Sequence, residues 1–453
     1  MMGTMRKRAV QFMAAALVLL LAAGCGGSGD GSGGAGTGNA VPGGAVGNAG
    51  GNTGGGSGGA AAGGELQGKL VIWTFFDQVQ EMGRKFEEKH PGVTVDVKMF
   101  PGDQYQTKLM SALQSGDNVP DIFDLERGYI GKFINTPFLT DLSELGADEL
   151  LKDYIPYVAE LGKSEDGRVK AISDHSSPGG FWYNRETAKQ VLGTDDPEQI
   201  SGMVDSWDKL VALGKQVNEK TGGKVSLIAN TGDLFDIVAY NMEPWVKDGK
   251  LHIDPRWREI YETQLQIRTS GGDAKLPFMS AGWGNALNDG TVVLTTMPAW
   301  ASFMIDNKNG KAEGKYGVAK TPEGYYSGGT YRGIYAKSKN RELAYEFIKY
   351  IASPEWQVYN LAKTGNMPGN GAVYESQMAT FRSPLLGEQN VMQSYYEMVK
   401  SIPARKADKY SEEVLSKWRK NAGKGVADNA PYEEVVESFK KEVKAAFPEI
   451  KME

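Results

Sequence analysis

The sequence predicts an α/β fold with a parallel β-sheet, organised in two lobes. Short apolar runs alternate with amphipathic stretches over residues 69–125, in the order expected for β-α-β-α-β units. This order implies a parallel sheet with right-handed crossovers. Roughly 390 residues follow Gly64, which is too many for one compact domain and suits two.

Each element of this first unit has its own signal. The run "KLVIW" is uniformly apolar, as is typical of a strand covered on both faces. The helix after it should end near Pro91, because proline restricts the residue before it. The expected elements are, in order, a strand at 69–73, a helix with its apolar face at 79–86, a strand at 93–99, a helix with its apolar face at 105–113 and a strand at 121–125.

The N-terminus has the pattern of a secretory signal peptide over residues 1–24. A basic start precedes the apolar run Phe12–Ala23, which is too short to cross a bilayer as a helix, since that needs about 20 residues. The closing Ala22-Ala23-Gly24-Cys25 resembles a bacterial lipobox, in which lipid is attached to the cysteine thiol. Cys25 is the only cysteine of the chain, and residues 25–64 form a glycine-rich linker. We therefore expect a lipid anchor on the extracellular face of the cell membrane; the alternative is an ordinary signal with an incidental cysteine.

Composition excludes several function classes. The net charge of −6 makes nucleic-acid binding a poor expectation, because such proteins present a basic face. The three histidines are widely separated, and no metal-binding spacing, phosphate-binding loop or nucleophile elbow is present. We therefore expect no enzyme activity, metal or cofactor. Aromatic residues make up 10% of the chain, and they are therefore the candidate functional residues in place of catalytic motifs.

Ligands of open parallel sheets lie beyond the carboxyl ends of the strands. This rule selects Phe75, Phe76 and Asp77 after the first strand, and Glu126 and Arg127 after the third. One of the two adjacent phenylalanines should pack inside and the other face the ligand. For the two acids the alternative role is capping of the helices that follow, which carboxylates do well.

Seven segments between residue 66 and the C-terminus follow one another in a familiar order: "KLVIWTFFD", "FEEKHPGVTVDV", "LQSGDNVPDIF", "GGFWYNRE", "SWDKLVALGKQV", "TTMPAW" and "SKNRELAYEFIKYIASPEWQ". With these segments the chain resembles the maltose-binding-protein class of solute-binding proteins of carbohydrate importers. The resemblance implies the two-lobed type II periplasmic-binding-protein fold, with a hinge and a ligand cleft between the lobes. The N-lobe would comprise residues 66–173 plus 327–365, and the C-lobe residues 174–326 plus 366–453.

The resemblance also implies ligand contacts. A carboxylate falls on Asp77 and an acid-arginine pair on Glu126-Arg127. The further contacts expected from it are Asp233, Phe235, the aromatic platform Trp300, and Tyr410. Departures from the family at the hinge and other cleft aromatics add Asp174, His175, Trp182, Trp283, Tyr331 and Arg332. Each of three residues has an alternative role that involves no ligand. His175 could be a hydrogen-bonded hinge residue, Tyr183 could line the cleft with Trp182 buried in its place, and Trp283 could be buried.

A sugar presents C–H faces to aromatic rings and hydroxyls to charged groups. The expected function is therefore a monomeric, lipid-anchored receptor that binds an oligosaccharide of two or more units. By lobe closure it would deliver this ligand to membrane permease subunits with a cytoplasmic ATPase. The alternatives left open are a non-sugar solute (a polyamine, a peptide or a ferric chelate) and an exported glycoside hydrolase.

Overall fold

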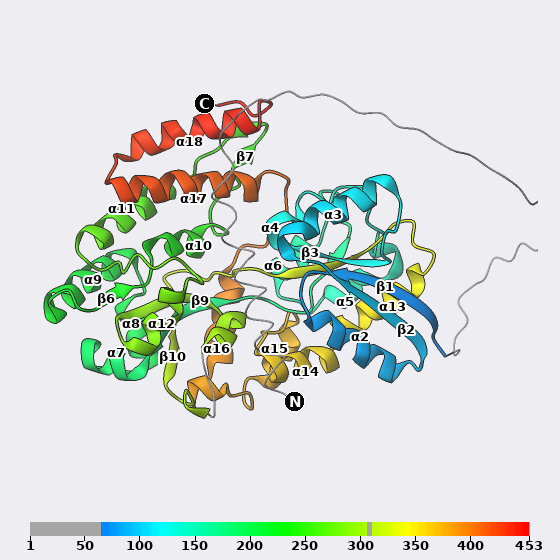
Figure 1. Ribbon diagram of the computed structural model, residues 1–453, viewed down its shortest axis with the longest axis horizontal. Coiled ribbons are helices and arrows are strands. Elements are labelled where there is room, and N and C mark those ends of the chain that lie inside the picture. The colour runs from blue at the N-terminus through cyan, green and yellow to red at the C-terminus, as the bar shows by residue number, and fades with distance from the viewer. Residues whose placement is uncertain (1–64, 306–309, 453) are drawn as a thin grey trace, which may run out of the picture. The chain divides into compact units, whose positions relative to one another are not determined.

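The computed structural model describes residues 65–305 and 310–452 (Figure 1). The predicted signal peptide 1–24, the lipidation site Cys25 and the linker 25–64 lie outside the described residues. The two-lobed α/β architecture is confirmed: the chain from Gln67 onward builds two separate main sheets, each with its own helices.

The first sheet defines the N-lobe and has the strand order β2-β1-β3-β11-β4. β1 runs parallel to β2 and β3, while β11 is antiparallel to both β3 and β4. The bounds are β1 (Gln67–Thr74), β2 (Gly92–Met99), β3 (Ile122–Glu126), β4 (Ala171–Ile172) and β11 (Thr330–Ile334). The parallel unit predicted over residues 69–125 is thereby confirmed.

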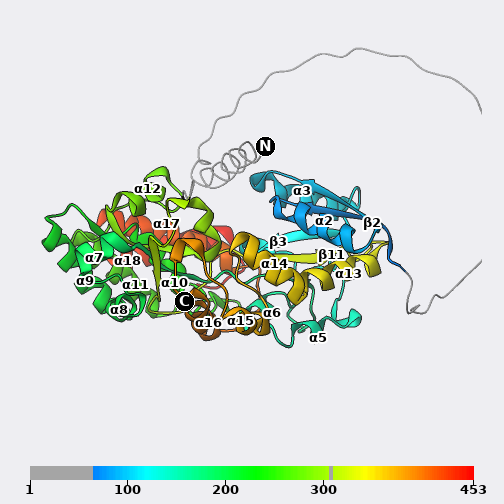
Figure 2. The same ribbon diagram turned by 90° about the horizontal axis from the view of Figure 1, so that it is seen from below.

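Helices α2 (Gln78–Lys89) and α3 (Gly102–Ser115) bury the faces that the periodicity predicted. Phe86 of α2 packs edge-on against Phe347 of α13 (Arg341–Ala352), with ring centroids 5.2 Å apart. Helix α13 comes from late in the chain and lies against β1, β11 and α2 (Figure 2). The C-terminal half of the sequence therefore completes the N-lobe.

The second sheet defines the C-lobe and has the order β10-β5-β9-β6. β5 is antiparallel to β10 and β9, and β6 is parallel to β9. The bounds are β5 (Gly179–Asn184), β6 (Ser226–Ile228), β9 (Val292–Pro298) and β10 (Tyr316–Ala319), with helices α7 (Arg185–Leu192), α8 (Pro197–Met203), α9 (Trp207–Thr221), α10 (Leu234–Val238), α11 (Arg256–Thr269), α12 (Ala281–Asp289), α17 (Ser411–Asp428) and α18 (Tyr432–Ala446).

Tryptophan packing fills the C-lobe core. Trp245 stacks on Trp257 at 4.9 Å, and Trp418 of α17 contacts both. Each of these three side chains is buried. Large aromatic side chains contribute most to the burial of apolar area, so these tryptophans are explained by stability rather than by ligand binding.

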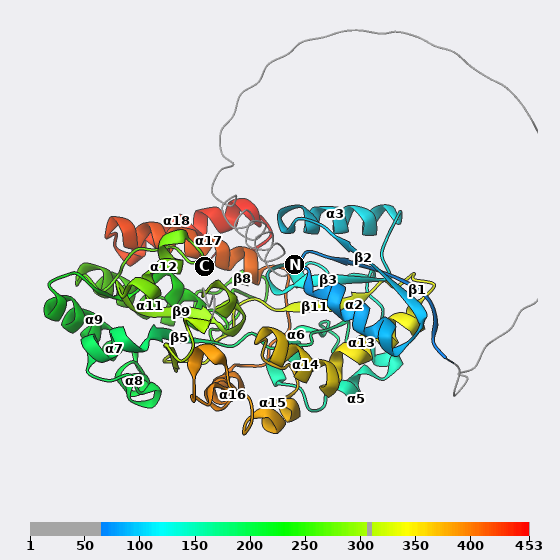
Figure 3. The ribbon, with the colours of Figure 1, turned by 60° about the horizontal axis from the view of Figure 1, so that its bottom comes forward.

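Three segments of the described chain pass between the lobes. The first joins β4 to β5, the second joins β10 to β11, and the third runs through α14 (Pro354–Thr364), α15 (Gly371–Gln377) and α16 (Val391–Ser401) (Figure 3). The shorter elements are α4 (Arg127–Ile130), α5 (Ala147–Leu151), α6 (Pro156–Leu161), the hairpin β7 (Val246–Lys247) and β8 (Lys250–Leu251), and the 3-10 turns η2 (Ser143–Leu145), η3 (Thr231–Asp233), η4 (Ala299–Met304) and η6 (Pro384–Leu386). Within the described residues, no helix has the length and apolar character that a membrane crossing requires.

Candidate functional site

Arg127 links the two lobes. It directly follows β3 of the N-lobe, and its Nη1 forms an ion pair with Glu412 in the first turn of α17. Its guanidinium lies over the ring of Tyr240 from the C-lobe, 4.2 Å from the ring centroid. Only 10% of the Arg127 side chain is exposed, so the pair is largely withdrawn from water. The carboxyl end of a central strand is thus joined to the opposite lobe by charge.

A stack of three tyrosines continues this contact through the hinge. Tyr157 of α6 stacks on Tyr326 with centroids 4.4 Å apart, and Tyr326 packs on Tyr240 at 4.6 Å. The sequence shows Tyr325 and Tyr326 only as a tyrosine doublet, a feature that ferric-chelate sites also use. Tyr157 and Tyr240 carried no signal of their own, because their meeting depends on the hinge geometry.

Glu126 has the capping role that was weighed as its alternative. Its carboxylate accepts a hydrogen bond of 2.6 Å from the Gly128 backbone amide, at the start of α4. Burial raises the pKa of Glu126, against the opposing effect of Arg127. Asp77 is different: it occupies the N-cap position of α2 without a side-chain capping bond and is exposed. Its carboxylate remains available for a ligand.

Phe75 and Phe76 are both partly exposed at the end of β1. Phe75 packs edge-on against buried Tyr105 at 5.3 Å, whereas Phe76 lies 5.8 Å from the guanidinium of Arg332. The structure therefore gives Phe75 the packing contact and makes Phe76 the better candidate for a ligand.

Trp300 lies on a half-buried aromatic surface in η4, directly after β9. Its Nε1 donates a 2.8 Å hydrogen bond to the Ser327 carbonyl, which fixes the orientation of the indole. Phe303 stacks beside it at 6.2 Å with an interplanar angle of 23°, and 50% of Phe303 is exposed. Phe278 meets Trp300 edge-on at 6.5 Å. Rings held this way can cover the C–H face of a ligand.

A cavity of about 10 Å³ adjoins this surface, which is room for roughly one water-sized group. Phe278 and Ser327, which both contact Trp300, line it together with Asp233 and Tyr325. Asp233 begins α10 but makes no side-chain capping bond, and its Oδ2 is buried without a hydrogen-bond partner. Burial, reinforced by Asp236 and Asp273, raises the pKa of Asp233 well above its usual range.

This shift predicts an unusual pH dependence. An acid whose pKa is raised by folding keeps its proton in the native state, so the protein loses stability as the pH rises above the ordinary aspartate pKa of about 3.9. Asp233→Asn removes this loss. We expect the variant to unfold at a higher temperature than the wild type at pH 7, with a gain that shrinks towards pH 4, in calorimetric scans. A gain that is independent of pH would contradict the assignment.

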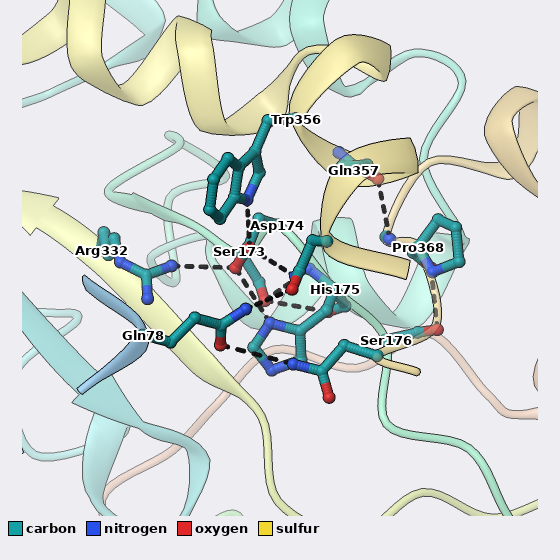
Figure 4. Close-up of polar contacts among 12 residues, drawn as sticks. Gln78, Ser173, Asp174, His175, Ser176, Arg332, Trp356, Gln357 and Pro368 are labelled. Atoms are coloured by element: carbon teal, nitrogen blue, oxygen red, sulfur yellow. Dashed lines mark hydrogen bonds and ion pairs between the residues drawn. The ribbon is translucent and has the colours of Figure 1, made fainter. Parts of the chain in front are cut away.

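Asp174 and Arg332 form a buried ionic network rather than an open ligand site (Figure 4). Arg332 Nη1 lies 2.9 Å from Asp174 Oδ1 and its Nε lies 3.1 Å from Asp124 Oδ1, and all three side chains are fully buried. Asp174 also accepts hydrogen bonds from Trp356 Nε1 at 2.7 Å and Asn360 Nδ2 at 3.1 Å. Burial alone would raise the pKa of Asp174, but the Arg332 charge and the hydrogen bonds hold it below its usual range.

Both ends of this network and four further residues predicted as ligand contacts are buried against protein partners. The interior holds Asp174, Arg332, Tyr331, Trp182, Phe235 and Trp283. Tyr331 donates its hydroxyl to the Val158 carbonyl, and Trp182 Nε1 donates to the Tyr395 hydroxyl. Phe235 packs in the C-lobe core and Trp283 packs under Phe278. Tyr183, the alternative to Trp182, is buried as well.

Two predicted contacts lie apart from the aromatic surface. His175 is 8% exposed and its Nδ1 lies 2.9 Å from Asp174 Oδ1, in the hydrogen-bonded hinge role weighed as its alternative. Tyr410 packs edge-on against Phe447 at 5.4 Å, and its hydroxyl lies 3.3 Å from Glu449. Asp233 and Trp300 lie at one surface, because Phe278 and Ser327 line the cavity beside Asp233 and both contact Trp300; the fold adds Tyr325 to the cavity and Phe303 to the surface. Arg127 lies at the lobe boundary with Tyr240 and Glu412. Phe76 and Asp77 follow β1 in the N-lobe.

A larger groove of about 480 Å³ lies elsewhere on the C-lobe. Its charged side chains neutralise one another: Arg256 pairs with Glu323, and Lys320 Nζ lies 3.2 Å from Glu397. No aromatic ring lines it. The larger volume therefore does not make this groove the better candidate for a sugar site. The aromatic rings at the Trp300 surface favour that surface instead.

The model of the family described as bacterial extracellular solute-binding protein matches residues 74–358. The arabinooligosaccharide-binding protein of Halalkalibacterium halodurans is 26% identical, over 63% of this chain and 68% of its own. The lactose-binding protein of Rhizobium radiobacter is 23% identical, over 74% of this chain and 83% of its own. A crystal structure of an extracellular solute-binding protein of family 1 superposes with a TM-score of 0.75 at 19% identity, covering 83% of this chain and 99% of that one.

Proposed function

Because the chain belongs to the bacterial extracellular solute-binding protein family, we propose that it binds an oligosaccharide for an ABC-type sugar importer. The ligand lies between the lobes, with one sugar ring on Trp300. Closure of the lobes over the ligand presents the complex to the permease subunits, whose ATPase drives uptake. A diacylglycerol on Cys25 holds the receptor, a monomer, at the extracellular face of the membrane.

The observation that carries this proposal is the pairing of Trp300 with buried polar groups. The indole and Phe303 offer apolar faces of the kind that sugar C–H patches cover. Asp233 and Arg127 offer donors and acceptors of the kind that bind hydroxyls. The names of the relatives, which bind arabinooligosaccharide and lactose, support a carbohydrate ligand.

Contacts from both lobes are needed if a ligand is to favour closure, because it must bind the closed form better than the open form. Phe76, Asp77 and Arg127 belong to the N-lobe, and Asp233 and Trp300 to the C-lobe. Their positions on different lobes support closure as the consequence of binding.

A calorimetric titration tests the proposal. The full chain carrying Cys25→Ser, which cannot be acylated on that thiol, is titrated with arabinotriose, lactose, maltotriose and β-1,6-galactobiose, and separately with putrescine and a tripeptide. We expect at least one neutral sugar to bind with a Kd near the micromolar range, about −8 kcal/mol. Binding of putrescine or the peptide with no sugar bound would withdraw the carbohydrate assignment.

Trp300→Ala should weaken the binding of that sugar by about tenfold or more, since stacking contributes on the order of 0.5–1.5 kcal/mol beyond area burial. Met99→Ala is the matched control, because Met99 is a large apolar side chain that is 51% exposed on the other lobe. Equal affinities for Trp300→Ala and the wild type, in the same titration, would remove Trp300 from the site.

The lipid anchor is tested by fractionation. The wild type should sediment with membranes and incorporate labelled palmitate, while Cys25→Ser should do neither and remain exported. An unlabelled, soluble wild type would leave Cys25 as an incidental residue after an ordinary signal.

Of the alternatives, an exported glycoside hydrolase draws on one observation. Burial raises the pKa of Asp233, and Asp236, which lines the same cavity, pairs with Arg419; two neighbouring carboxyl side chains are the arrangement that glycosidases use. Release of reducing ends from the panel sugars, abolished in Asp233→Asn, would support this candidate over the receptor.

A further inference from the structure

We infer that Tyr325 and Asp233 form the floor of the sugar site and together read a single hydroxyl of the ring that stacks on Trp300. This inference rests on the proposed function and adds to it a specificity-determining residue, Tyr325. Their polar groups share one cavity, and neither is satisfied by the fold.

Tyr325 is held rigidly. Its ring lies flat against Gly179, where even a Cβ would come within 1.9 Å of the ring carbon Cζ. Only 1% of the residue is exposed, yet its hydroxyl has no hydrogen-bond partner among residues 65–305 and 310–452. Burial raises the pKa of the Tyr325 hydroxyl well above its usual range. The nearby Gly180 amide opposes this rise but makes no hydrogen bond to the hydroxyl. A buried hydroxyl without a partner costs stability, so its presence calls for a reason outside the fold.

Asp233 supplies the complementary group. Its Oδ2 is buried without a partner, although helix N-termini elsewhere in this chain use the same residue type to cap, as Asp196 does by accepting from the Gln199 amide. A carboxyl that keeps its proton can both donate and accept. A sugar hydroxyl placed between the two groups would therefore satisfy the carboxyl and the phenol together.

The size of the cavity limits the chemical group that can enter it. About 10 Å³ admits a hydroxyl-sized group and excludes a ring. Phe278 and Pro298 contribute apolar parts of the wall, and Asp236, Thr296 and Ser327 complete it. The cavity meets the Trp300 surface through Phe278 and Ser327, so the ring that donates the hydroxyl is the one on the indole. Sugars whose hydroxyl at that carbon is missing or reversed should be rejected.

A structural role and a ligand-binding role of the two groups predict different changes in the melting temperature of the free protein. If the two groups serve the ligand, Tyr325→Phe and Asp233→Asn leave the melting temperature of the free protein unchanged or raised, while both weaken sugar binding. If they serve the fold, both variants melt earlier. Tyr183→Phe is the matched control, because Tyr183 is also a buried tyrosine of the C-lobe and its hydroxyl donates to the Asp195 carbonyl, outside the cavity. That control should melt earlier and bind with wild-type affinity.

The experiment titrates these variants, in the full Cys25→Ser chain, with the tightest-binding sugar of the panel and with its monodeoxy derivatives. We expect Tyr325→Phe to bind the parent sugar about tenfold more weakly than the wild type. One deoxy derivative should bind wild type and Tyr325→Phe equally, which identifies the hydroxyl that is read.

Three results would overturn the inference, and they distinguish its failure from that of the proposed function. If the wild type binds a panel sugar but both variants match it for the parent and every deoxy derivative, the floor assignment is wrong and the receptor function stands. A crystal structure of that complex with a water, rather than a sugar hydroxyl, between Tyr325 and Asp233 has the same meaning. If the wild type binds no panel sugar at all, the proposed function fails and this inference fails with it.

Discussion

Arg332→Met should lower the free energy of unfolding by about 3–5 kcal/mol, the cost of leaving buried carboxylates without their partner. Arg332 lies on β11 directly opposite Asp124 of β3, and its Nη1 reaches Asp174. Methionine fills a similar volume without charge, so both carboxylates lose their counter-ion in a fully buried site. Chemical denaturation measures the loss.

The pH dependence gives this prediction a second readout. The pKa of Asp174 is depressed in the native state, so its contribution to stability is present above the ordinary pKa of about 3.9 and is lost as the pH falls through the native value. The difference between wild type and Arg332→Met should therefore stay near its full size from pH 7 down to about pH 4 and shrink as the pH falls below that value. Arg341→Met, at an exposed position of α13, is the control and should change little. An equally stable Arg332→Met variant would mean that the network is not a structural element.

Gly131→Ala should destabilise the protein by about 1–3 kcal/mol, the range for an overpacked contact. A Cβ at Gly131 would lie 2.0 Å from the Asp408 carbonyl oxygen, a backbone atom that cannot rotate away. Asp408 leads directly into α17, whose Glu412 pairs with Arg127. The substitution therefore pushes α17 away from the end of β3 and should also weaken sugar binding.

Gly423→Ala is the matched control for this substitution. It lies inside α17 with nothing within 4 Å of the added Cβ, and alanine is the better helix former by about 1 kcal/mol. We expect it to be neutral or stabilising in the same thermal scans. If Gly131→Ala behaves like Gly423→Ala, the N-lobe does not pack on α17 in solution as described.

Local patterns predicted the strands and helices of the N-lobe well, because the signal for each element lies within fewer than twenty consecutive residues. The stripe from Val79 to Phe86 marks a face that the fold buries, and the alternating valines mark a strand face on which Val93 is buried and Val95 and Val97 are half-buried. The alternative capping role of Glu126 is also local, since the acceptor and the Gly128 amide are two residues apart.

The site could be predicted only in part, because it depends on contacts between distant segments. Nothing near Glu412 indicates that it would meet Arg127, which lies 285 positions earlier. Arg332 was expected at a ligand because it stands among the departures from the family pattern, directly after Gly328-Gly329-Thr330-Tyr331. Its strand lies between β3 and β4 in the sheet, however, and the side chain is enclosed with two carboxylates. The position of Tyr325 in the cavity could not be predicted for the same reason, because it depends on the space that the distant Gly179 leaves for its ring.

The most direct test of the account is a crystal structure of the Cys25→Ser chain with its tightest-binding panel sugar. We predict a sugar ring on the indole of Trp300, one hydroxyl between Tyr325 and Asp233, and contacts to Asp77 or Arg127 from the opposite lobe. A sugar in the groove beside Arg256 and Glu323, or one that touches a single lobe, would contradict it.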